Sequence, residues 1–194
     1  HKEIILKNKK ISLRYGVIDL DRTITGYLKG NYNESADKFE THNGNTIPSW
    51  RNFHWKSKHS SVGIELPSDI IPKITSDLKS QIVSDSKIHT IAHVLVNASK
   101  ILTKSESNDI DVYYEKGIIY LYDNSSDGYN GCSKIIFDKF DKILNTCYLL
   151  LSDCNCSDGK SQDWEGCPKC TFTTNYCQTK NRELSKSKAK EFFS

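Results

Sequence analysis

Four of the seven cysteines lie in one short segment, residues 154–170, which reads CNCSDGKSQDWEGCPKC. Cys154 and Cys156 form a Cys-x-Cys pair, and Cys167 and Cys170 form a Cys-x-x-Cys pair with a proline inside it. Structural zinc takes four ligands in a tetrahedron, and thiolates suit it well. The spacing therefore predicts one structural Zn²⁺ ion held by all four cysteines, with no open position for a catalytic water.

Other uses of these cysteines remain open. An iron–sulfur cluster also takes four cysteines, and a thioredoxin-like Cys-x-x-Cys would need a β-α-β setting that the order of elements does not provide. Two disulfides are disfavoured because a secreted scaffold usually spreads its cysteines along the chain. Clustered thiols favour a reduced, cytoplasmic setting. Cys147 is expected in the core, whereas Cys132 and Cys177 are interpreted as spare thiols, Cys177 being a less favoured alternative ligand.

The N-terminal third alternates with the period of β-strands. Residues 2–7, 11–20 and 22–30 are predicted strands of an antiparallel meander, with a tight Asp-Leu-Asp connection between the last two. Residues 30–60 contain scattered Gly, Asn, Ser and Pro and are predicted to be irregular. A short strand over residues 60–67 should follow, stopped by its proline.

From about residue 76 the apolar period becomes helical, which predicts a helix to about residue 103. Residues 110–123 are predicted to form a hairpin that turns near Lys116 and Gly117. A second helix is expected over residues 132–152, and a polar helix over about 179–193. The fold class is therefore α+β. An antiparallel β-rich part, residues 1–67, should precede an α+β zinc-binding domain, residues 68–194.

Basic and aromatic residues are mixed in the segment before the predicted zinc-binding domain. Residues 41–64 contain no acidic side chain. Within them, four residues are candidate nucleic-acid contacts, because aromatic rings stack on bases and cations meet phosphates: Arg51, Trp55, Lys56 and Lys58. The alternative is a long loop whose aromatic side chains anchor it while its cations face water. The basic run over residues 180–193 is a weaker candidate, since such runs are usually solvated helix faces.

His89 and His93 lie four residues apart on one face of the predicted helix. That spacing can serve a metal, but the glutamate of a His-Glu-x-x-His motif is missing. We interpret the pair as histidines packed at or near the core with hydrogen-bond partners.

Taken in order, these motifs resemble the MrfA-type zinc-binding (MZB) domain. This domain occurs at the C-terminal end of MrfA/Hrq-like superfamily-two DNA helicases and in DISARM-type helicase-associated proteins. The matching motifs are the paired histidines of the helix, the hairpin that begins near Asp109 and ends in IIYLYD, the glycine-containing turn DGYNGCSKIIF, and the two cysteine pairs. The stretch KHSSVGIELP also resembles the strand that precedes the domain. Two departures are the missing Gly-Gly pair and the ten residues between the cysteine pairs.

The resemblance implies a C-terminal accessory domain of an ATP-dependent DNA helicase, acting in DNA repair or antiphage defence. Its expected partners are DNA, single-stranded or forked, and a helicase motor in cis or in trans. The chain has no G-x-x-x-x-G-K-[ST] phosphate loop, so we expect no ATP hydrolysis by the chain itself. The alternative is a non-catalytic protein-interaction subunit that recruits a separate helicase.

Three features bear on the setting of the chain. No apolar run approaches the roughly 18 residues that a membrane span needs, so no membrane partner is expected. The chain begins at His1 and contains no methionine, which leads us to expect a fragment of a longer protein. The net charge of +3 permits nucleic-acid binding without arguing for it.

Overall fold

The computed structural model describes residues 1–6, 9–33, 38–71, 78–156, 167–173 and 184–194. The chain divides into two compact units. The first, which we call the main unit, comprises residues 1–18 and 59–194, and the second, which we call the ribbon unit, comprises residues 19–58. Each is described by itself. The predicted boundary at residue 67 is a different division and stays a prediction.

The sheet is antiparallel and contains five strands in the order β1-β2-β3-β5-β4. The strands are β1 (Lys2–Leu6), β2 (Lys9–Asn33), β3 (Lys38–Glu65), β4 (Ile110–Glu115) and β5 (Ile118–Asp123). The register places Val62 of β3 opposite Leu121 of β5, and Leu121 opposite Val112 of β4. Alternate residues of β2, β3 and β5 therefore point into one core, as the period-two pattern requires.

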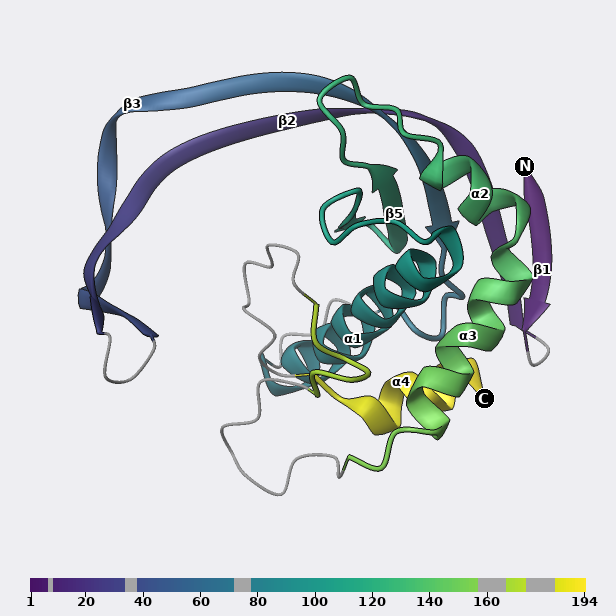
Figure 1. The fold of residues 1–194 in the computed structure, drawn as a ribbon. Coiled ribbons are helices and arrows are strands. Elements are labelled where there is room, and N and C mark those ends of the chain that lie inside the picture. The colour runs from purple at the N-terminus through teal and green to yellow at the C-terminus, as the bar shows by residue number, and fades with distance from the viewer. Residues whose placement is uncertain (7–8, 34–37, 72–77, 157–166, 174–183) are drawn as a thin grey trace. The chain divides into compact units, whose positions relative to one another are not determined.

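Four helices complete the described fold (Figure 1): α1 (Leu78–Thr103), α2 (Cys132–Asp138), α3 (Phe140–Ser152) and α4 (Lys186–Phe193). Within the main unit α1 packs against β4, α3 and α4, while α2 packs against β5. The α+β class predicted from the sequence is confirmed. Within the described residues, no helix is long and apolar enough to cross a membrane.

The hydrophobic stripes predicted for the helices are buried. On α1 the buried residues include Ile91, Leu95 and Ala98. The stripe of the second predicted helix is buried at every position: Ile136, Phe140, Ile143, Leu144, Cys147 and Leu151. Cys147 is a core residue, as predicted, and its Sγ atom lies 3.7 Å from the carbonyl oxygen of Val94.

Three predictions about the strands and helices need correction. No connection interrupts β2 at residues 19–21, because the strand continues from Lys9 to Asn33. The segment predicted to be irregular falls largely on β3, so Gly, Asn and Pro were poor markers of a loop there. The predicted helix over residues 132–152 is two helices, α2 and α3, which meet at Lys139 with backbone angles φ −115° and ψ 27°.

The remaining element predictions agree with the structure more closely. β1 and the hairpin of β4 and β5 lie where the sequence placed them. Lys116 and Gly117 occupy the hairpin turn with φ values of 49° and 84°, the left-handed pair that a two-residue hairpin turn needs. The C-terminal helix begins later than predicted, at Lys186, and residues 174–183 lie outside the described residues.

Candidate metal centre

The sulfur atoms of the four predicted cysteines lie together. Their Sγ atoms are all within 4.8 Å of one another. The Sγ atoms of Cys154 and Cys167 are 3.6 Å apart, and so are those of Cys156 and Cys170. A tetrahedral ion with zinc–sulfur bonds of about 2.3 Å separates its ligands by about 3.8 Å, whereas a disulfide joins two sulfurs at about 2.0 Å. The spacing fits one tetrahedral ion and no disulfide.

The first cysteine pair is positioned by the end of α3. That helix is capped at Asp153, whose backbone N–H donates to the carbonyl of Leu149 at 2.9 Å. Cys154 and Cys156 follow directly. Leu151, in the last turn of α3, is fully buried. The packing of α3 therefore fixes the position from which the Cys154 and Cys156 pair extends.

The second pair sits in a tight turn. The carbonyl oxygen of Cys167 accepts backbone hydrogen bonds from Cys170, Thr171 and Phe172, at 3.2, 3.0 and 2.8 Å. In the other direction, the N–H of Cys167 donates to Oγ1 of Thr171 at 2.8 Å. The N–H of Lys169 points at the Cys167 sulfur, 3.4 Å away. These hydrogen bonds fix the conformation of the turn and the direction of the Cys167 sulfur.

Two side chains of helix α1 form hydrogen bonds with carbonyl groups at the end of this turn. Nδ1 of His93 lies 3.0 Å from the carbonyl oxygen of Thr171, and Nδ2 of Asn97 donates to the carbonyl of Phe172 at 2.8 Å. His93 is almost fully buried, and burial lowers its pKa to about 4. The imidazole is therefore neutral at pH 7 and donates from Nδ1. Residues that orient a ligand turn in this way are part of how a metal site is built.

The surroundings of the sulfurs affect the pKa values of the thiols in opposite directions. The backbone N–H of Cys156 lowers the pKa of the Cys154 thiol to about 7. Burial has the opposite effect on Cys156 and Cys170 and raises the pKa of both thiols. Two of the four sulfurs would thus resist ionisation alone, and a bound divalent ion supplies the positive charge that makes thiolates stable there.

The other predicted metal candidates behave as structural residues. His89 and His93 stack edge to face with ring centroids 4.3 Å apart, and the buried His93 has its partner in Thr171, as the packed interpretation predicted. Within the described part of the chain, the cysteine quartet is the group of His, Cys, Asp or Glu side chains placed to hold a metal. Cys132 is buried, and Cys177 lies outside the described residues.

The predicted nucleic-acid residues lie on β3 of the ribbon unit. They are therefore on a strand, and the alternative of a long loop is wrong. Lys56 pairs with Asp21 at 3.6 Å and Lys58 with Asp19 at 3.1 Å, and the Trp55 side chain is 41% exposed. The side chain of Arg51 lies outside the described residues.

The sequence did not indicate the contacts that two further residues make, although one of them, Asp123, belongs to a motif quoted for the family resemblance. Asp123, fully buried, ends the IIYLYD motif, and its carboxylate accepts backbone N–H groups from Asn130, Gly131 and Ser133. It therefore ties β5 to the start of α2. Lys186 donates from Nζ to the carbonyl oxygens of Cys154 and Cys156. A lone lysine in a basic run gives no hint of such a contact.

Four clustered cysteines on an α+β scaffold define the class of the domain, a zinc-binding domain. Residues 91–171 match the model of the MZB family, described as the MrfA Zn-binding domain. The chain is 30% identical over 112 residues to the uncharacterized protein MJ1572.1 of Methanocaldococcus jannaschii, a match that covers 53% of this chain and 92% of that protein. One structural zinc as the cofactor is thereby confirmed, while the assignment of its ligands stays a prediction.

Solved structures share the fold. The DUF1998 helicase MrfA bound to DNA matches with a TM-score of 0.54 and 20% identity, covering 94% of this chain and 23% of that one. MrfA bound to DNA and AMPPNP matches with a TM-score of 0.51 and 15% identity, covering 96% of this chain and 22% of that one. The chain thus spans less than a quarter of the helicase chains that it matches.

Proposed function

We propose that this chain is a zinc-stabilised C-terminal accessory domain of an ATP-dependent DNA helicase, and that it contributes to nucleic-acid engagement in DNA repair or defence. One observation carries the proposal: the likeness to MrfA covers 94% of this chain but only 23% of a helicase chain whose structure is described as bound to DNA. On this proposal the motor lies elsewhere, in cis or in trans, and the chain does not hydrolyse ATP alone.

The zinc ligands in this proposal are Cys154, Cys156, Cys167 and Cys170. Their spacing, their tight turn and the buried surroundings of two of them support the assignment. When bound, the ion would supply a cross-link between the end of α3 and the turn held by α1. Four thiolates leave no place for a reactive water, so the role is structural. Ligands that must stay reduced are consistent with a cytoplasmic location.

The ribbon unit is the proposed region of DNA contact. The side chains of Lys56 and Lys58 are 73% and 78% exposed, and those of their partners Asp21 and Asp19 are also largely exposed. These ion pairs are therefore well hydrated. An exposed pair of this kind contributes only about 0–1 kcal/mol. A DNA phosphate can therefore replace the carboxylate at little cost, while the half-exposed Trp55 ring offers a surface for a base.

The experiment measures the affinity of zinc-loaded protein for a labelled single-stranded oligonucleotide by fluorescence anisotropy, over a series of salt concentrations. Each phosphate contact on a single strand contributes about 0.7 to the slope of log K against log salt. The variant Lys56→Ala/Lys58→Ala should lower that slope by about 1.4. Asp19→Asn/Asp21→Asn should strengthen binding, because it removes the carboxylates that compete with phosphate.

The matched control is Lys139→Ala/Lys142→Ala, which removes two exposed lysines of the main unit. If this control lowers the slope as much as the ribbon variant, the contact is not specific to the ribbon. Forked DNA tested beside the single strand identifies the preferred partner. If the parent chain binds neither at low salt, the interaction-subunit alternative replaces DNA engagement.

A further inference from the structure

Lys186 is the first residue of α4, and its ammonium group contacts the cysteine cluster. It donates hydrogen bonds to two carbonyl oxygens at once, that of Cys154 and that of Cys156, the latter at 3.2 Å. Both belong to the Cys-x-Cys turn, and α4 lies outside the residues 91–171 that match the family. A single side chain from the C-terminal helix thus contacts the backbone of two of the four proposed ligand residues.

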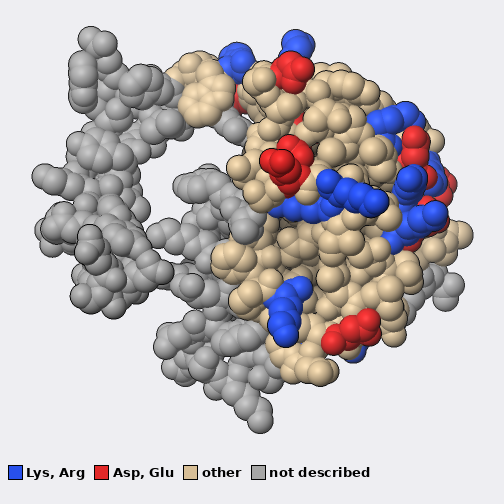
Figure 2. Space-filling view, in the orientation of Figure 1, with Lys and Arg blue, Asp and Glu red and all other residues tan. Residues whose placement is uncertain are grey.

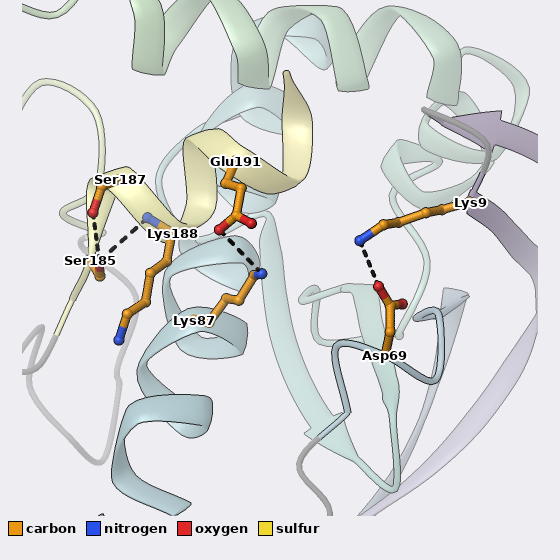
Figure 3. Close-up of polar contacts among 7 residues, drawn as sticks. All are labelled: Lys9, Asp69, Lys87, Ser185, Ser187, Lys188 and Glu191. Atoms are coloured by element: carbon orange, nitrogen blue, oxygen red, sulfur yellow. Dashed lines mark hydrogen bonds and ion pairs between the residues drawn. The ribbon is translucent and has the colours of Figure 1, made fainter. Parts of the chain in front are cut away.

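The position of Lys186 is fixed by the helix that carries it. Ser185 caps α4 by accepting the N–H of Lys188 at 3.4 Å, and its own N–H donates to Oγ1 of Thr90 on α1 at 2.8 Å. Figure 3 shows this cap, together with the ion pair between Lys87 of α1 and Glu191 of α4 at 3.7 Å. At the other end of the helix Phe192 and Phe193 are buried.

Charge supplies the second reason for a lysine at this point. A zinc ion with four thiolates carries a net charge of about −2. The cluster is partly withdrawn from water, since Cys167 and Cys170 are buried, so this charge is less well solvated than on the surface. On the face of the molecule drawn in Figure 2, Lys and Arg are interspersed with Asp and Glu. Lys186 brings a cation to the cluster without contributing a ligand.

We propose that Lys186 is a positioning residue of the zinc centre. It holds the Cys-x-Cys turn in the conformation that directs both sulfurs at the ion, and it offsets part of the negative charge of the tetrathiolate. Zinc binding is thereby coupled to the docking of α4 on the core. This inference rests on the proposed ligand set.

The test measures the zinc dissociation constant by competition with a chromophoric chelator at pH 7.5. The variants are Lys186→Ala, Lys186→Gln and Lys186→Arg, with Lys190→Ala as the control that removes a lysine one turn further along α4. Loss of such an outer partner weakens metal binding by about 10- to 100-fold. We expect Lys186→Ala to weaken zinc binding about 10-fold or more, Lys186→Gln to weaken it less, and Lys186→Arg and Lys190→Ala to stay near the parent.

Hydrogen exchange gives a second readout that does not depend on affinity. In the parent, removal of zinc should increase deuterium uptake in residues 186–193 while α1 keeps its protection. In zinc-loaded Lys186→Gln, which keeps a donor and serves if the alanine variant does not fold, α4 should already exchange faster.

The outcomes distinguish a failure of the positioning role of Lys186 from a failure of the proposed ligand set on which it rests. If Lys186→Ala and Lys186→Gln bind zinc as tightly as Lys190→Ala, and α4 exchanges alike with and without zinc, the positioning role is overturned while the ligand set stands. If the parent chain binds no zinc, or if Cys167→Ser/Cys170→Ser still binds it, the proposed ligand set fails.

Discussion

Removal of the Asp123 carboxylate should destabilise the main unit strongly. It is fully buried and accepts three backbone N–H groups, from Asn130 at 3.0 Å, Gly131 at 3.0 Å and Ser133 at 2.6 Å. Gly131 is the N-cap of α2 and has no side chain of its own to cap the helix. Asp123, at the end of the preceding strand β5, therefore takes the place of the capping side chain, and we choose Asp123→Ala as the perturbation.

The magnitude follows from the burial of each donor. The Ser133 bond is buried and charge-assisted, a kind that contributes about 1.5–3 kcal/mol, and its loss leaves an N–H group without water. The Asn130 and Gly131 bonds are partly buried, so water can replace the carboxylate there at a cost of about 1 kcal/mol each. Asp123→Ala should therefore lower the free energy of unfolding by about 4 kcal/mol. Asp123→Asn keeps one acceptor and should lose about half of that.

The assay is urea unfolding of zinc-loaded protein followed by circular dichroism. Asp138→Asn is the control: its carboxylate is about half-exposed and pairs with Lys134 on the surface of α2, so its loss should cost less than about 0.5 kcal/mol. If Asp123→Ala lowers the free energy of unfolding by less than about 1 kcal/mol, the reasoning about the α2 cap is refuted.

Two further predictions concern pH and the hairpin turn. His93 has a pKa of about 4 in the fold and about 6.5 when unfolded. Acidification from about pH 6.5 to about pH 4 should therefore lower the free energy of unfolding by up to about 3 kcal/mol. An NMR titration of the zinc-loaded protein with a His93 midpoint near pH 6.5 would contradict this. Gly117→Ala should cost about 1–2 kcal/mol in urea unfolding, because φ is 84° and the new Cβ would lie 2.6 Å from Cδ1 of Ile71. Gly16→Ala, whose Cβ would meet nothing within 4 Å, should change stability by less than about 0.5 kcal/mol; equal effects of the two would rule out the strained turn.

The sequence could predict what depends on local spacing. The short spacing within each cysteine pair is visible in the sequence and is typical of metal ligands. The apolar stripe of α3, which ends at Leu151, has the helical period of a buried face. The hairpin turn at Lys116 and Gly117 was predictable because few residues adopt its backbone angles readily.

What could not be predicted depends on partners that are distant along the chain. The strand β3 is stabilised by ladders to its neighbours, which can override the local preferences of Gly, Asn and Pro. The role of Lys186 arises because α4 docks beside the Cys-x-Cys turn, which lies 30 residues earlier at Cys156. His93 was predicted to have a partner, but nothing local identified it as the carbonyl of Thr171.

The most direct test of the central claim is the metal content of the purified chain. Protein prepared without chelator is analysed by mass spectrometry for zinc and iron per chain, beside Cys167→Ser/Cys170→Ser. We predict one zinc per chain in the parent, and in the variant loss of the zinc together with a lower free energy of unfolding, because binding energy at such a site adds to folding energy. A parent chain that holds iron, or that holds no metal and has oxidised cysteines, would contradict the account.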